Sequence, residues 1–222
     1  MANHYRTKAV VLSKKNVKEA DQLFSLFSED FGKISVLGRG IRKITSKLRS
    51  GIDTFYFSEV EFIQGKEIKT LTDTVALDKF HGSDRISEAT EAIVSGQEKD
   101  RRVWDLLMES LGQGCSSEIA CHFYFWNLLS ISGYGFNLGD CLKCGRKLPE
   151  DNNTFSFGGG GIFCSCSEGD IKISANAIKL LRIILRKDWK TLARLSCPKT
   201  LFSELDSLSW KVQETLIRQH SM

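Results

Sequence analysis

The sequence predicts an α+β protein in which a small N-terminal β-barrel precedes an α-helical domain with a cysteine-rich insertion. Three observations lead to this prediction. Over residues 1–80, hydrophobic residues recur in short, strand-like runs separated by turns. Over residues 81–222, their spacing lengthens to that of amphipathic helices. Within this second part, residues 140–169 hold four of the seven cysteines of the chain.

Five runs rich in Val, Ile, Phe and Thr are expected to form the strands. The connections Glu29–Lys33 and Gln64–Lys66 contain glycine, which adopts the positive φ that tight hairpin turns need. Closure into a barrel protects the strand edges that an open sheet of this size would expose. The expected strands are Tyr5–Ser13, Gln22–Ser28, Ile34–Leu37, Phe55–Ile63 and Glu67–Thr72.

Four segments of the second part are expected to form helices. The first breaks or bends at Ser95-Gly96, where glycine interrupts the pattern. The second stops at Ser132-Gly133, because glycine suits the left-handed residue that ends a helix. Ser174 is a suitable N-cap for the third. The expected helices are Ser87–Leu111, Glu118–Ile131, Ala175 to about Leu195, and Thr200–Gln219.

Length and composition are those of an ordinary soluble globular protein. Of 222 residues, 41% are hydrophobic and 26% are charged. The longest mostly apolar stretch, Phe123–Ile131, is far shorter than the roughly 20 residues that cross a bilayer. The N-terminus lacks the pattern of a secretory signal. We therefore expect a cytoplasmic protein that contacts no membrane and acts on no small-molecule substrate.

The clustered cysteines are spaced as metal ligands. Cys141-x-x-Cys144-Gly is a typical metal knuckle, and Cys164-x-Cys166 adds a second pair. Cytosolic thiols stay reduced, so paired spacings there indicate a metal rather than a disulfide. Four thiolates satisfy tetrahedral Zn²⁺ with no open position, which predicts structural zinc. Because Cys-x-Cys is a tighter bite than the commoner Cys-x-x-Cys, Cys197 remains an alternative to Cys166.

Positive charge gathers in the first part of the chain. The net charge is +4, and residues 1–80 hold 14 Lys and Arg against 10 Asp and Glu. No acidic residue lies between Asp30 and Asp53. Such a run favours nucleic acid, because each cation near a phosphate releases condensed counterions; a solvated basic loop is the plainer alternative. Its basic residues are Lys33, Arg39, Arg42, Lys43, Lys47 and Arg49.

A second basic run covers Lys172–Lys199, where eight Lys and Arg accompany the single acid Asp188. If the segment is one helix, four of these cations are spaced by three or four residues and share a face. This face is either a second binding surface or a solubilising outer face, and the pattern does not favour one over the other. The four residues are Lys179, Arg182, Arg186 and Lys190.

Signatures of catalysis are weak. The four histidines form no His-x-x-x-His or Cys-His pattern, so we predict that the chain is not an enzyme and assign no catalytic residue. Glu19 and Asp21 form a possible carboxylate pair, but nothing nearby complements it as a metal site and a structural role is favoured. Adjacent helical residues point in different directions, so the aromatic run Phe123–Trp126 is expected in the core rather than beneath DNA bases.

The order of these features resembles RecO, a family of bacterial DNA repair and recombination mediators. The resemblance extends along most of the chain, and it rests on the order and spacing of motifs that are individually weak. The motifs of the first part are Lys8–Leu12, Glu19–Leu23, Phe31–Ile34, Gly38–Lys43, Ser46-Lys47 and Val60–Phe62. Those of the second part are Tyr134–Phe136, Cys141–Arg146, Phe155, Gly160-Gly161 and the Cys164/Cys166 pair.

The resemblance implies an N-terminal OB-fold over residues 1–80 and a helical domain over 81–222 with a zinc-binding segment at 140–169. It implies binding of single- and double-stranded DNA, annealing of strands including those coated by the single-strand binding protein SSB, and action with RecR to load RecA. The partners would then include the acidic tail of SSB, and the protein would associate with the nucleoid. By position, the DNA contacts it implies are Arg39, Arg42, Lys43 and Lys47, followed by Lys14, Lys15 and Arg49.

Two other functions compete with a DNA-annealing mediator. One is a metal-dependent nuclease, although hydrolysis of phosphodiesters calls for carboxylate or histidine ligands and an open metal position rather than four thiolates. The other is a zinc-containing adaptor whose basic face meets an acidic protein tail. The adaptor overlaps with the mediator, because SSB ends in such a tail.

Overall fold

The computed structural model describes residues 3–65, 68–80, 84–94, 96–112 and 118–220. Packing divides the chain into two compact units, Met1–Ser116 and Ser117–Met222. The first unit is built around strands and the second mainly from helices, which confirms the predicted α+β class. Lys66, Glu67 and Ser95, predicted in a turn, a strand and a helix break, lie outside the described residues. Within those residues, no helix is both long and apolar enough to cross a membrane.

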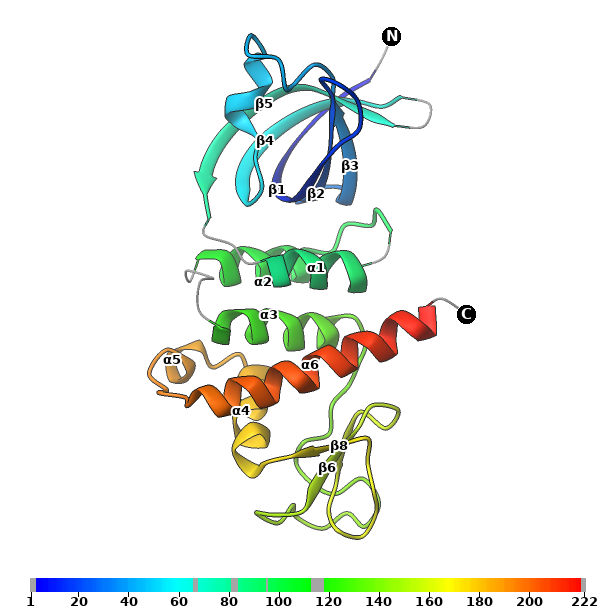
Figure 1. Ribbon diagram of the computed structural model, residues 1–222, viewed down its shortest axis with the longest axis vertical. Helices are drawn as coiled ribbons and strands as arrows, with labels where there is room; N and C mark the ends of the chain where they lie inside the picture. The colour runs from blue at the N-terminus through cyan, green and yellow to red at the C-terminus, as the bar shows by residue number, and fades with distance from the viewer. Residues whose placement is uncertain (1–2, 66–67, 81–83, 95, 113–117, 221–222) are drawn as a thin grey trace. The chain divides into compact units, whose positions relative to one another are not determined.

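Five strands of the first unit close into a barrel, as Figure 1 shows. They are β1 (His4–Asn16), β2 (Gln22–Ser28), β3 (Gly32–Gly38), β4 (Tyr56–Ile63) and β5 (Lys69–Lys79). Around the barrel the order is β1-β2-β3-β5-β4. Neighbours are antiparallel except at the closure, where β3 and β5 pair in parallel through Val36–Lys69 and Leu37–Thr70.

Two strands extend beyond the predicted bounds. The β1 strand continues to Asn16 after a register shift between Val11 and Ser13, so Lys14 and Lys15 belong to it. The β5 strand continues to Lys79. Both extensions carry mostly exposed residues and therefore form no apolar run in the sequence. A short 3₁₀ helix, η1 (Lys47–Gly51), was also not predicted.

Alternating side chains of the strands fill the barrel. Tyr5 packs against Phe31 and Phe62, with ring centroids 5.6 Å away in each case, so it belongs to the barrel core. Two core residues, Ile41 and Ile52, come from the connection between β3 and β4 and fix that connection to the barrel. The other core members are Ala9, Val11, Phe24, Leu26, Ile34, Val36, Val60, Phe62 and Leu71.

Helices α1 (Asp84–Ile93) and α2 (Arg101–Gly112) belong to the same unit as the barrel. Trp104 of α2 stacks on Phe27 with ring centroids 6.4 Å apart, and Arg101 forms an ion pair of 2.6 Å with Glu29. Gly32 has a φ of +60°, and a Cβ there would lie 2.3 Å from the carbonyl oxygen of Glu98, so only glycine permits this approach. The packing boundary therefore follows Ser116, whereas the sequence placed the domain boundary at residue 80.

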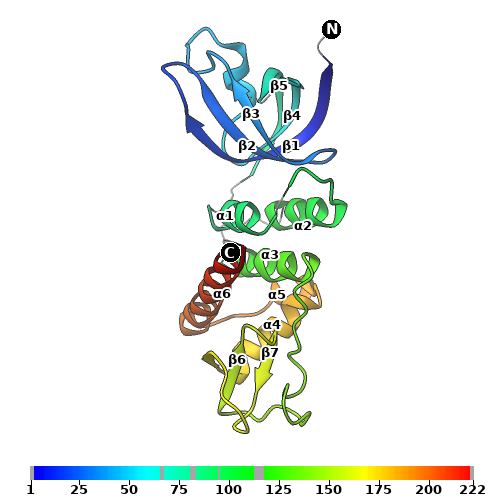
Figure 2. The ribbon, with the colours of Figure 1, turned by 90° about the vertical axis from the view of Figure 1, so that its right-hand side faces the viewer.

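The second unit is built on α3 (Glu118–Ile131), which is buried on every side. Phe123, Tyr124, Phe125 and Trp126 are at most 6% exposed, which confirms their predicted place in the core. Helices α4 (Ala175–Leu185) and α6 (Lys199–His220) pack on α3, as Figure 2 shows. Beside them, β6 (Asn153–Ser156), β7 (Gly161–Phe163) and β8 (Ile171–Ile173) form a sheet in the order β7-β6-β8.

The prediction of a single helix from Ala175 to about Leu195 was wrong, because this segment forms two helices. Its predicted cap is confirmed, since the amide of Ala177 donates to Ser174 Oγ at 3.2 Å. The helix ends at Leu185, however, and Lys187 turns the chain with a φ of +56°. A separate short helix, α5 (Trp189–Leu192), then begins with Asp188 as its cap. The break occurs at a lysine, and the sequence has no glycine or proline there that would indicate a helix end.

Candidate nucleic-acid interface and metal centre

The acid-free segment Gly38–Arg49, here called the basic loop, is anchored to the segment that precedes β2. The amide of Gly40 donates to Asp21 Oδ1 at 2.7 Å. Arg42 is held twice, because its amide donates to the carbonyl of Ala20 and its Nη1 donates to the carbonyl of Glu19, both at 3.0 Å. Asp21 therefore has the structural role that the sequence favoured. These hydrogen bonds fix the start of the basic loop, from which its cations project.

A pocket of about 360 Å³ lies beside the basic loop. Three of the predicted DNA contacts line it: Lys14 from β1, Arg42 from the loop and Arg49 from η1. The carboxylate of Asp53 also lines it and is paired with Lys14 Nζ. The remaining lining residues are Gln22, Ile41 and Ile52. The fold thus brings three cations and one acid from separate segments to one concave site, which suits a bound anion.

The Lys14–Asp53 pair sets the charge of this pocket. Desolvation raises the pKa of Asp53, but hydrogen bonds from Lys14 Nζ and from the Thr54 amide outweigh it, so the pKa lies below its ordinary value. Asp53 is therefore ionised at neutral pH and neutralises Lys14. A phosphate that enters the pocket must compete with this carboxylate for Lys14.

The four other predicted DNA contacts are exposed to solvent. Lys33, a basic residue of the same acid-free run, is instead bound within the protein. Lys33 is drawn toward α1, where its Nζ donates to the carbonyl of Glu91 at 3.0 Å and desolvation lowers its pKa. It therefore lies apart from the candidate interface. The exposed residues are Arg39, Lys43 and Lys47 around the basic loop, and Lys15 on β1.

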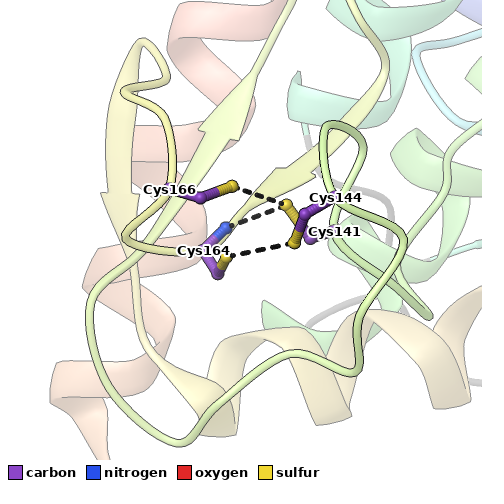
Figure 3. A group of neighbouring side chains, drawn as sticks. All are labelled: Cys141, Cys144, Cys164 and Cys166. Atoms are coloured by element: carbon purple, nitrogen blue, oxygen red, sulfur yellow. Dashed lines mark hydrogen bonds between the residues drawn. The ribbon is translucent and has the colours of Figure 1, made fainter.

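The four clustered cysteines meet at one point of the second unit, as Figure 3 shows. All four Sγ atoms lie within 4.8 Å of one another. Two pairs are closer, with 3.5 Å between Cys141 and Cys166 and 3.7 Å between Cys144 and Cys164. Four sulfurs at about 2.3 Å from a tetrahedral zinc ion would lie about 3.8 Å apart. The spacing of these thiols therefore fits a four-thiolate metal site.

Hydrogen bonds around the first pair favour thiolates. The amides of Cys144 and Cys164 donate to Cys141 Sγ and lower the pKa of Cys141 to about 5. The Arg146 side chain, whose Nε lies 3.4 Å from Cys144 Sγ, lowers the pKa of Cys144. Hydrogen bonds with the other thiols, first that of Cys164, raise the pKa of Cys166 to about 12. Without a metal, the cluster therefore retains protons that a divalent ion would displace.

The peptide chain around the cluster has the form of a knuckle. Gly145 has a φ of +68°, its amide donates to the carbonyl of Cys141 at 2.9 Å, and the Cys141 amide donates to the carbonyl of Arg146 at 2.9 Å. Cys197, the alternative ligand, is not a member of the four-cysteine group found in the described part of the chain. It lines a separate hollow with Pro198.

The second basic run does not form a continuous stripe. Arg182 turns inward, where its Nε donates to the carbonyl of Leu138 at 2.7 Å and its Nη2 donates to the carbonyls of Leu138 and Gly139. The exposed Arg186 caps the end of α4, and Lys190 lies on α5. Lys179 remains exposed on α4. One of the four predicted cations thus binds the segment that precedes the cysteine knuckle.

Comparison with known families gives two matches that together cover residues 1–220. A family model described as "Recombination protein O N terminal" matches residues 1–80, and one described as "Recombination protein O C terminal" matches residues 77–220. The chain belongs to the RecO family. A DNA repair protein RecO of Dehalococcoides mccartyi is 31% identical over 91% of this chain and 86% of its own length.

Two further RecO relatives cover similar shares of both chains. The protein of Caldicellulosiruptor bescii is 25% identical over 92% of this chain and 89% of its own. That of Acetivibrio thermocellus is 26% identical over 98% and 94%. Both have the name DNA repair protein RecO. Membership in the RecO family places the chain among DNA repair proteins.

Residues that sequence reasoning missed are those whose roles depend on tertiary contact. Asp53 and Gln22 line the pocket beside the basic loop. Asp53 stands in no motif, and Gln22 belongs to the motif Glu19–Leu23, which assigned it no contact. Arg146 directly follows the Cys-x-x-Cys-Gly motif, and this position was the one available signal for its contact with Cys144. Among the aromatic residues of the first unit, Phe57 packs on Trp104 and Phe80, and Tyr56 lies beneath Lys79 Nζ.

Proposed function

We propose that the chain is a DNA-binding recombination mediator that anneals complementary single strands, including SSB-coated strands, and acts with RecR to help load RecA in recombinational repair. Membership in the RecO family supports this role. The five-stranded barrel is proposed to be an OB-fold, a class of small barrel that binds single strands. The observation that carries DNA binding is the pocket shared by Lys14, Arg42 and Arg49.

The pocket is proposed to receive a backbone phosphate. A bound phosphate takes the place of Asp53 beside Lys14 and gains contact with the guanidinium groups of Arg42 and Arg49. The exposed Arg39, Lys43, Lys47 and Lys15 neutralise neighbouring phosphates. Affinity then comes mainly from released counterions and does not depend on base sequence.

Annealing by such a surface requires no catalytic residue. Two complementary strands repel each other through their phosphates, and base pairing supplies the free energy once they meet. A protein that neutralises one strand lowers the repulsion and leaves the bases free to pair. The proposed activity is therefore electrostatic shielding combined with strand alignment.

The cysteine cluster is proposed to hold structural zinc through Cys141, Cys144, Cys164 and Cys166. The sulfur spacing and the thiolate-favouring hydrogen bonds support this ligand set. Four thiolates fill the tetrahedral shell, so the ion would fix the knuckle rather than activate water. This donor chemistry also argues against the nuclease alternative, which needs oxygen or nitrogen ligands and an open position.

The acidic tail of SSB is proposed to contact the exposed part of the second basic run. Lys179 lies at a hollow of about 500 Å³ whose lining includes Leu180, Ile183 and Leu201. Lys190 is exposed on α5. An acidic peptide matches the charge of these lysines, and this contact is distinct from the proposed phosphate pocket.

A strand-annealing assay tests the proposed function. Fluorescently labelled complementary oligonucleotides, free or coated with SSB, are mixed with the protein in the absence of nucleotide and Mg²⁺. We expect annealing to accelerate with both substrates. Failure to anneal, together with cleavage when Mg²⁺ is supplied, would establish the nuclease instead. Failure with SSB-coated strands alone would remove the proposed SSB contact and leave DNA binding in place.

A further inference from the structure

Ile44 is an aliphatic side chain that the fold leaves almost entirely in water. It is 93% exposed, whereas the other exposed large hydrophobic residues of the described part range from 43% for Val17 to 70% for Trp210. Scattered apolar residues on a surface are ordinary, but they usually lie partly against a neighbour. Ile44 therefore offers nearly all of its apolar surface to a partner.

The backbone around Ile44 holds it at a tip. The amide of Ser46 donates to the carbonyl of Lys43 at 3.0 Å, which closes a turn with Ile44 at its first central position. The preceding turn is closed by the Lys43 amide and the carbonyl of Gly40, also at 3.0 Å. Gly40 is itself bound to Asp21. Two successive turns on an anchored base thus present the side chain outward.

The charged residues of the basic loop itself are all positive. Arg42 and Lys43 precede Ile44 directly, Arg39 and Lys47 flank it, and no acid lies between Asp30 and Asp53. A matching partner must be anionic on its outside and apolar a short distance inside. A DNA strand has this arrangement, with charged phosphates outside and the faces of stacked bases within.

We propose that Ile44 inserts between neighbouring bases of single-stranded DNA held by the basic loop. This inference rests on the proposed function and adds that the same site acts on the bases as well as on the phosphates. Apolar side chains at such tips can separate stacked bases. A single strand is the favoured ligand, because unstacking it breaks no base pairs. Separated bases are then prevented from forming secondary structure within the strand and remain available for pairing.

The test uses a single strand that contains 2-aminopurine between adenines, whose fluorescence rises when the base is unstacked. Wild-type protein should raise the fluorescence at saturation. Ile44→Ser should abolish most of this rise and weaken binding about tenfold, the loss expected for roughly half of a buried aliphatic side chain. The salt dependence of binding should not change, because no charge is removed. Ile44→Leu should behave like the wild type.

Two matched variants complete the design. Val75→Thr changes an exposed apolar residue on β5, outside the basic loop, and should alter neither signal. Lys47→Ala should reduce the salt dependence and preserve the fluorescence rise. Equal fluorescence and affinity for wild type and Ile44→Ser would overturn the inference. If Ile44→Ser matches the wild type with DNA but binds an acidic, leucine-containing peptide more weakly, Ile44 would be assigned to a protein partner instead. Absence of salt-dependent DNA binding by the wild type would reject the proposed function itself.

Discussion

The basic loop Gly38–Arg49 and the second basic run Lys172–Lys199 are both rich in cations, yet the fold uses their charges differently. In the first, Arg42 and Arg49 converge with Lys14 on one pocket, and the loop is anchored through its backbone. In the second, the helix breaks at Lys187, and Arg182 is bound to backbone carbonyls. The comparison shows that charge density alone does not make a binding surface. The cations must also converge on one site, as Lys14, Arg42 and Arg49 do.

The largest expected effect concerns the four-cysteine cluster, which follows the segment that Arg182 binds. Replacing Cys141 and Cys144 together by serine should remove bound zinc and lower the melting temperature by on the order of 10 °C or more, because metal binding is coupled to folding. DNA affinity at a temperature where the protein remains folded should stay within about twofold of wild type. Metal content, thermal melting and fluorescence anisotropy measure the three quantities.

Cys197→Ser is the matched control for this double variant. Cys197 lies outside the four-thiol group, so zinc content and melting should be unchanged. Loss of zinc on this substitution would identify Cys197 as a ligand. Loss of DNA binding by the double variant without a change in melting would instead indicate that the knuckle contacts DNA, and would reverse the comparison.

A smaller effect is expected at Arg182, the cation of the second run that turns inward. Arg182→Ala leaves the carbonyls of Leu138 and Gly139 without these bonds and should lower the free energy of unfolding by about 2 kcal/mol. Its effect on DNA affinity should be negligible. Lys179→Ala, one turn earlier on the exposed face of α4, should change stability little. Denaturant unfolding compares the two, and equal stabilities would show that the internal contacts of Arg182 contribute nothing.

The smallest effect on binding is expected at Asp53, which reduces the positive charge of the pocket beside the basic loop. Asp53→Asn removes the carboxylate that competes with phosphate, so DNA affinity should rise a few-fold, by roughly 1 kcal/mol or less. The matched control is Asp73→Asn, because Asp73 is exposed on β5 and also accepts a bond from the next amide. Fluorescence anisotropy at neutral pH measures both variants. An equal gain for both would indicate a general effect of net charge rather than a pocket.

The same pair predicts the sign of a pH effect. The folded-state pKa of Asp53 is lowered, so its ionised form contributes stability above the unfolded pKa of about 4. This contribution is lost as pH falls through the lower, folded-state pKa. It is well below 1 kcal/mol after solvent screening, because the pair is partly exposed. Unfolding curves of wild type and Asp53→Asn should therefore approach each other in acid.

Much of the fold could be predicted from the sequence, because the spacing of hydrophobic residues differs between strands and helices. The five strands, the buried helix α3 and the Ser174 cap were all recognisable in this way. The break at Lys187 was not, because Leu192 continues the apolar spacing across it. Likewise, α1 and α2 are helical in pattern, and only their contacts with the barrel place them in its unit.

The candidate sites likewise combine features that local sequence patterns predict with features that depend on tertiary contacts. The cysteine pairs could be identified because ligand spacing within each pair is local, and the structure brings the pairs together. The acid-free run could be identified from composition. Convergence of Lys14, Arg49 and Asp53 on one pocket depends on the register of β1 against β2 and on the path of η1, which no local pattern encodes.

The most direct test of the central claim compares charge reversals in the two regions. Arg42→Glu with Lys43→Glu and Lys179→Glu with Lys190→Glu change the net charge equally. DNA affinity is measured by anisotropy across a range of salt concentrations. The first pair should weaken binding on the order of a hundredfold and flatten the salt dependence, whereas the second should leave the slope close to that of wild type. An unchanged slope for the first pair, or an equal loss in both, would contradict the assignment of DNA binding to the basic loop.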